Sequence, residues 1–131
     1  MIAVFVLVFP FCTLKDDYMA TISQKIDMFE NPKVFVSQPM KGKTKEKILE
    51  ERERVKRTLD GYFRGNPYTI IDSVLTPPKN STNEALWCLG TSMQLLSEAN
   101  VAIFAEGWEL ARGCWREHEC CIRYGIHTLY A

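Results

Sequence analysis

Glu117 is the side chain in this sequence with the clearest capacity for chemistry. It lies in the stretch 105–125, AEGWELARGCWREHECCIRYG, directly after an apolar run at 100–104 that predicts a buried strand. The spacing predicts a helix over 113–124 with Glu117 at the edge of its apolar side and near its N-terminus. The partial positive charge of a helix N-terminus favours an ionised carboxylate, which suits nucleophilic attack on carbon. A boundary glutamate in a surface ion pair is the plainer interpretation of the same spacing. The side chains predicted on the apolar side are Cys114, Trp115, His118, Cys121, Ile122 and Gly125.

A candidate anion-binding loop follows the first predicted strand. The strand is KVFVS at 33–37, and the loop QPMKGKT at 38–44 supplies glycine, Lys41 and Lys43 before a helix that Thr44 can cap. Backbone N–H groups, a helix N-terminus and cations together attract an anion. Ordinary surface lysines explain the loop equally well, because it lacks a complete phosphate-binding motif.

Other residues offer weaker chemistry. Trp108 lies in a predicted loop, where its ring could stack on a base, whereas Trp87 and Trp115 are expected in the core. Cys120 and Cys121 beside a histidine suggest a thiol or metal site. Adjacent helical residues point about 100° apart, however, so the two cannot serve one site.

Strands and helices alternate along the chain without hairpin signals, which predicts an α/β fold with a parallel sheet and right-handed crossovers. Strands are expected over 33–37, 68–72, 100–104 and 126–130, and helices from 45, over 84–98 and over 113–124. The long loop at 73–83 is of a kind that is often functional. The predicted buried side chains are Ile48, Val55, Leu59 and Tyr62 on the first helix and Leu86, Leu89, Met93 and Leu96 on the second.

Composition limits the class of protein. The 131 residues carry 16 basic and 16 acidic side chains, so no overall field favours a nucleic acid polymer or a membrane surface. The five cysteines form no CxxC pair, which argues against a disulfide framework or zinc site and for a reduced, cytoplasmic setting. We expect a domain at 32–131 preceded by an appendage at 1–31.

The opening segment MIAVFVLVFPFC at 1–12 is apolar but too short to span a bilayer. A secretory signal is the less favoured interpretation, because no basic region precedes the apolar run and no small-residue cleavage site follows it. An additional strand and a disordered tail are the other interpretations of this segment.

The pattern around Glu117 resembles nucleoside 2-deoxyribosyltransferases and the related 2'-deoxynucleoside 5'-phosphate N-hydrolases. Those enzymes place one glycine four residues before the nucleophilic glutamate and another eight residues after it, matched here by Gly113, Glu117 and Gly125. SQPMKGKT, LWCLGTSMQLLSEANV and GWELARGCWREHE also resemble small phage and bacterial deoxyribosyltransferase-like proteins. The resemblance covers about residue 33 to the C-terminus. It implies a three-layer, flavodoxin-like or Rossmann-like fold with a parallel sheet of four to five strands.

The resemblance also implies a reaction. Glu117 would attack the anomeric carbon of a 2-deoxyribosyl group, expel the base and form a glycosyl–enzyme intermediate. The run at 40–43 is similar to the Ile-Arg-Gly-Gly-Arg run that receives the 5'-phosphate in the hydrolases, and Arg112 could add a bidentate contact. The substrate-binding residues implied are Ser37, Gln38, Pro39, Met40, Lys41, Gly42, Lys43, Asp72, Trp108, Arg112 and Gly113. We expect a small nucleoside or nucleotide as ligand, no cofactor or metal, and a homo-oligomer, because relatives build the pocket across a subunit interface.

The chain departs from the enzymes at the residues that assist the nucleophile. Ser92 stands where they carry an aspartate, Asn100 replaces the acidic residue of the third strand, and Ala111 replaces an aspartate of the transferases. Protonation of the leaving base then lacks an evident donor, since general acid catalysis needs a group of suitable pKa. The candidate substitutes are His118, Glu119 and Asp72, each with a structural alternative. The competing hypothesis is a binding module that kept the pocket and lost turnover, and a structural or assembly role is a third.

Overall fold

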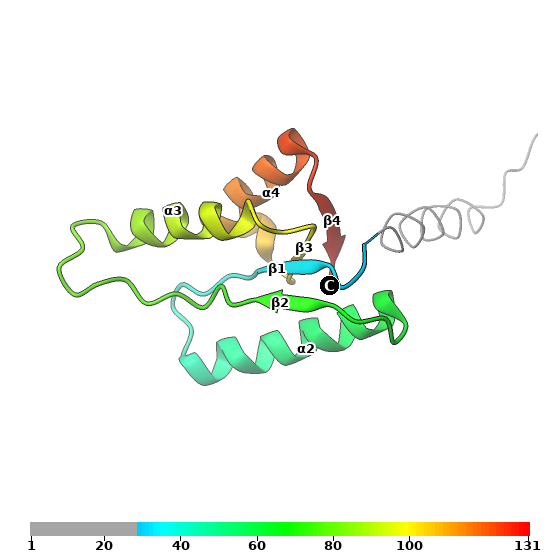
Figure 1. Cartoon of the computed structure of the whole chain (residues 1–131). Helices are drawn as coiled ribbons and strands as arrows, with labels where there is room; N and C mark the ends of the chain where they lie inside the picture. Colours follow the sequence, from blue (N-terminus) through cyan, green and yellow to red (C-terminus); the bar gives the residue numbers. More distant parts are fainter. Residues whose placement is uncertain (1–28) are drawn as a thin grey trace, which may run out of the picture.

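A four-stranded parallel sheet forms the centre of the computed structural model, which describes residues 29–131 (Figure 1). The strands are β1 (Lys33–Ser37), β2 (Thr69–Ile71), β3 (Val101–Phe104) and β4 (His127–Tyr130). Their order in the sheet is β2-β1-β3-β4, and each neighbouring pair is parallel. Of the predicted appendage, 1–28 lies outside the described residues. The predicted α/β class and parallel sheet are confirmed.

Helices cover both faces of the sheet and give a three-layer arrangement. They are α2 (Lys45–Phe63), α3 (Glu84–Leu96) and α4 (Arg112–Tyr124), with a short 3-10 turn η1 (Trp108–Leu110) before α4. Val55, Leu59 and Phe63 of α2 pack with one set of strand side chains, whereas Leu96 of α3 and Cys121 of α4 pack with the other. Within residues 29–131, no helix combines the length and apolar character that crossing a membrane requires.

The alternation of side chains along β1 decides which helix each strand residue meets. Val34 and Val36 join the core beneath α2, and Phe35 joins the core beneath α3 and α4. Successive strand residues point to opposite faces, so Ser37 shares a face with Phe35. The last residue of β1 therefore faces α4.

Local signals explain where the helices begin and end. Thr44 caps α2 as predicted, and its side chain accepts a hydrogen bond from the backbone N–H of Lys47. Asn83 caps α3 in the same way. Gly125 ends α4 in the left-handed conformation at φ 72°, which glycine adopts without strain.

The predicted buried faces of two helices are wrong in part. Three side chains expected in the core are exposed: Leu86 by 62%, Trp87 by 37% and Trp115 by 54%. The described buried residues of α3 are Ser92 and Leu96, both in its C-terminal half. For α3, Figure 1 gives the reason, since the loop at 73–83 and the first turns of this helix reach well beyond the sheet. Periodicity identifies the apolar face of a helix, but no part of the described chain covers that face at the start of α3.

Candidate functional site

Ser37 and Glu117 form the polar centre of the candidate site. Ser37 is 1% exposed, Glu117 is 7% exposed, and the Ser37 hydroxyl donates a hydrogen bond of 2.5 Å to Oε2 of Glu117. Ser92 of α3, itself buried, acts on the same carboxyl group and lowers its pKa, whereas the described hydrogen bond to Glu117 comes from Ser37. One strand and two helices, β1, α3 and α4, thus converge on one carboxyl group. Glu117 lies in the middle of the buried side of α4, between Cys114 and Cys121, and not at its edge as expected.

Burial controls the ionisation of Glu117. Loss of hydration raises the pKa of the Glu117 carboxyl above its usual value, and Ser37 and Ser92 oppose that rise. The helix N-terminus was expected to favour the ionised form, but burial outweighs any such effect at Glu117. The field of a helix N-terminus weakens within the first turn, and Glu117 is the sixth residue of α4. The two serines are what stabilises the ionised form.

Cys114 lies beside Glu117 in the site, although it was predicted only as a side chain of the apolar face. It lies three residues before Glu117 on the same side of α4 and is 5% exposed. Burial raises the pKa of the Cys114 thiol to about 11, while a hydrogen bond with Ser37 and the charge of Lys43 act to lower it. The thiol therefore stays protonated at neutral pH. The i, i+3 spacing to Glu117 was the available signal.

The site lies at the end of β1, where the order of the strands in the sheet reverses. β1 is flanked by β2 on one side and β3 on the other, and in open parallel sheets ligands bind beyond the strand ends at such a point. The backbone N–H of Ala105, just after β3, donates to the carbonyl of Ser37 at 2.9 Å. Gly107 lies against Pro39, so the loops after β1 and β3 are adjacent. Pro39 and Ser37 are thus at the expected ligand-binding edge.

Gln38 is engaged within the protein. Its Nε2 donates to the Ile48 carbonyl at 3.0 Å, and its Oε1 accepts from Nε of Arg52 at 2.8 Å. Arg52 also donates to the Ser73 hydroxyl at 2.9 Å, and that hydroxyl donates to the carbonyl of Val36. These contacts show Gln38 fixing α2 to the strand ends.

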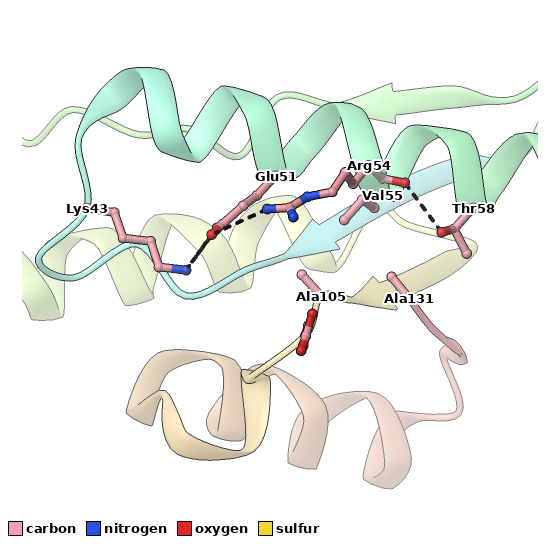
Figure 2. A pocket seen from close by; sticks show the side chains of 8 residues that line it. Lys43, Glu51, Arg54, Val55, Thr58, Ala105 and Ala131 are labelled. Carbon is pink, nitrogen blue, oxygen red and sulfur yellow. Dashed lines mark hydrogen bonds and ion pairs between the residues drawn. The ribbon is translucent and has the colours of Figure 1, made fainter.

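Lys43 lines a pocket of about 310 Å³ on the α2 side of the sheet (Figure 2). Its ammonium group contacts both carboxylate oxygens of Glu51, at 3.0 and 2.9 Å. The lining residues are Lys43, Glu51, Arg54, Val55, Thr58, Ala105, Glu106 and Ala131. Lys43 is the one predicted ligand-binding residue among them, and Glu117 does not line this pocket. Lys43 therefore lines this pocket without Glu117, although its charge also acts on the Cys114 thiol beside that carboxylate.

The rest of the predicted anion loop forms a tight turn. The backbone N–H of Lys43 donates to the carbonyl of Met40 at 3.1 Å, and Gly42 takes a positive φ of 75° that favours glycine. Lys41 is exposed. Arg112, the first residue of α4, is also exposed.

Two further predicted substrate-binding residues, Gly113 and Asp72, have different surroundings in the structure. A Cβ atom added to Gly113 would meet nothing within 4 Å, so packing within the described chain does not require glycine there. Asp72 is exposed at the end of β2, where its side chain accepts a hydrogen bond from the backbone N–H of Val74 at 3.1 Å. This is the turn-capping role that short acidic side chains often take.

His118 belongs to an aromatic cluster. Its ring stacks on Trp108 with centroids 4.2 Å apart, and its Nε2 is 2.7 Å from the Tyr130 hydroxyl. Phe104 packs edge-on against it at 4.9 Å. Burial lowers the pKa of His118, and the charge of Glu109 acts in the opposite direction. One face of the Trp108 ring is thereby occupied by His118.

Comparisons with known proteins add no assignment. No protein-family model matches the chain, and neither the curated proteins nor the solved structures gave a match. Among residues 29–131, no three His, Cys, Asp or Glu side chains are grouped closely enough to hold a metal ion.

Proposed function

We propose that this protein is a nucleoside deoxyribosyltransferase-like enzyme that cleaves or transfers the N-glycosidic bond of a 2'-deoxynucleoside or its 5'-monophosphate. The observation that supports the proposal best is the buried Glu117 carboxyl group, which accepts a hydrogen bond from Ser37 at the end of β1 and whose pKa Ser92 also lowers. A buried carboxylate that accepts a hydrogen bond from the Ser37 hydroxyl is restrained in its orientation, which a nucleophile requires.

Glu117 would act through one of its carboxylate oxygens. Attack on the anomeric carbon expels the base and leaves a glycosyl ester, which water or a second base then resolves. The hydrogen bond from Ser37 keeps the other oxygen in place and favours the ionised form before attack.

The leaving base needs a proton or must depart as an anion. The described contacts of the three candidate donors lie elsewhere, since His118 bonds Tyr130, Glu119 pairs with Arg116, and Asp72 caps a turn. We therefore infer that water protonates the base and that bases able to leave without strong acid assistance are preferred substrates.

The second candidate is a nucleotide-binding module without turnover. It is favoured by the residue at position 92, because Ser92 replaces the carboxylate that assists the nucleophile in the enzymes this chain resembles. A serine hydroxyl is too weak an acid to protonate the base. In that case the Ser37–Glu117 pair would orient a sugar hydroxyl.

Incubation with a panel of 2'-deoxynucleosides and their 5'-monophosphates separates the two candidates. Chromatography should detect free base with the wild-type chain and none with Glu117→Gln. Glu119→Gln is the matched control, because Glu119 lies on the same helix but pairs with Arg116 and Arg123. Ligand-induced thermal stabilisation without base release would favour the binding module. Release that survives Glu117→Gln would exclude Glu117 as nucleophile.

We further propose a homo-oligomer and a cytoplasmic location. The apolar side chains of Leu86 and Trp87 are exposed on the projecting turns of α3, where a second copy of the chain can cover them. Within residues 29–131 the cysteines are free thiols, as expected in a reducing compartment.

A further inference from the structure

The pocket beside α2 presents cationic and acidic side chains around a small apolar floor. Lys43, Arg54 and Thr58 come from the α2 side, and Glu106 comes from the loop after β3. Val55, Ala105 and Ala131 supply the apolar lining, as Figure 2 shows. A volume of about 310 Å³ is within the range of small-molecule sites.

The two cations of this pocket are not equally engaged. Lys43 is 29% exposed and contacts both oxygens of Glu51 within 3.0 Å. Arg54 is 52% exposed and approaches Glu51 only to 3.9 Å, beyond hydrogen-bond distance. One carboxylate thus serves two cations, and the donor fork of Arg54 remains available. A planar guanidinium binds an oxyanion in bidentate fashion.

Glu106 adds a negative charge to the lining of this pocket, beside the positive charges of Lys43 and Arg54. It is exposed and lies in the loop that follows β3, whereas Arg54 lies on α2. A carboxylate accepts hydrogen bonds from ammonium or N–H groups. A ligand that carries only an anion would use Arg54 but make no use of the Glu106 carboxylate.

We propose that this pocket binds a small amphoteric molecule, with its oxyanion on Arg54 and its ammonium or N–H donor on Glu106. The oxyanion can be a carboxylate or a phosphate, which share this chemistry. The site is separate from Glu117 and does not depend on the proposed glycosidase reaction.

Amide NMR titrations of the full chain test this proposal with matched probes. β-Alanine and O-phosphoethanolamine carry an ammonium two carbons from a carboxylate or a phosphate, and acetate, inorganic phosphate and ethanolamine each carry one charge type. We expect saturable shifts at the backbone amides of Val55, Thr58 and Ala105 with an amphoteric probe. The tighter of the two amphoteric probes identifies the oxyanion.

Two variants assign the ends of the ligand. Arg54→Gln should weaken amphoteric binding about tenfold, as expected for loss of a charge-assisted contact, and should leave the rest of the spectrum unchanged. Arg57→Gln, on the exposed surface of the same helix, should bind as the wild type does. Glu106→Gln should weaken the amphoteric probes but not inorganic phosphate or acetate.

Three results would overturn the proposal. The first is the absence of saturable shifts with both amphoteric probes up to about 10 mM, the limit of very weak binding. The second is binding that Arg54→Gln does not weaken. The third is single-charge anions binding as tightly as the amphoteric probes, which would remove the role of Glu106.

Discussion

Ser37 and Glu117 are 80 residues apart in the chain and joined by a hydrogen bond of 2.5 Å. The bond connects the end of β1 to the buried side of α4. Because parallel strands end at the same edge of the sheet, the fold brings a residue of the first strand to a helix that follows the third. This contact defines the candidate site.

Ser37→Ala should shift the ionisation of Glu117. Loss of the donor raises the carboxyl pKa further, so the acid limb of kcat/KM for base release should move to higher pH. The fold should lose about 1–3 kcal/mol of unfolding free energy, because a buried acceptor loses its partner. A pH–rate profile and urea denaturation measure both effects.

Ser97→Ala is the matched control for that substitution. Ser97 is exposed after α3 and bonds a local carbonyl, so its loss should change stability by no more than about 0.5 kcal/mol. If Ser37→Ala gives the pH profile of the wild type, the hydrogen bond does not tune Glu117.

The stability of the fold should depend on pH through Glu117. Its folded pKa is raised above the usual 4.5, so the native state binds more protons than the unfolded chain does. The associated stabilisation is present below pH 4.5 and is lost as pH rises through the folded pKa. Glu117→Gln removes this dependence. The difference in unfolding free energy between wild type and variant should fall with rising pH in that window, and a constant difference would contradict the assignment.

Arg52→Ala should be among the more destabilising changes in α2. It leaves Oε1 of Gln38 without its donor and removes the link to Ser73, for an expected loss of about 2–4 kcal/mol. Arg57→Ala, exposed on the same helix, should cost no more than about 0.5 kcal/mol. Equal losses in the two variants would show that Gln38 is not held by Arg52 in solution.

Leu86→Glu should dissociate the proposed oligomer. The substitution places a charge on the exposed apolar turns of α3, and light scattering with size exclusion should show a smaller mass than for the wild type. Gln94→Glu, exposed on the same helix, is the control and should leave the mass unchanged. A monomeric wild type would contradict the oligomer.

Much of the fold could be predicted from local signals. The strand over 33–37 has the predicted bounds, and α2 begins after Thr44 because the cap is a local interaction. The strand predicted over 68–72 is shorter, at Thr69–Ile71, and α3 ends at Leu96 and not at 98. Helix and strand ends depend on fraying and tertiary contact, which local spacing does not contain.

The arrangement of the candidate site was harder to predict from the sequence. A helical projection centred on apolar residues put Glu117 at an edge, whereas contacts with Ser37 and Ser92 turn it inward. The pairing of Lys43 with Glu51 joins a loop to the middle of a helix. Such a pairing can be seen only in the packed structure. From the sequence alone, a lysine such as Lys43 suits an anion site and an internal ion pair equally well.

Trapping the glycosyl–enzyme intermediate tests the central proposal most directly. A 2'-deoxy-2'-fluoroarabinosyl nucleotide slows breakdown of such an ester, and intact-protein mass spectrometry with peptide mapping locates the adduct. We expect one fluorosugar phosphate on the peptide that contains Glu117, and none in Glu117→Gln. An unmodified wild-type protein that binds the analogue, or an adduct on another residue, would contradict it.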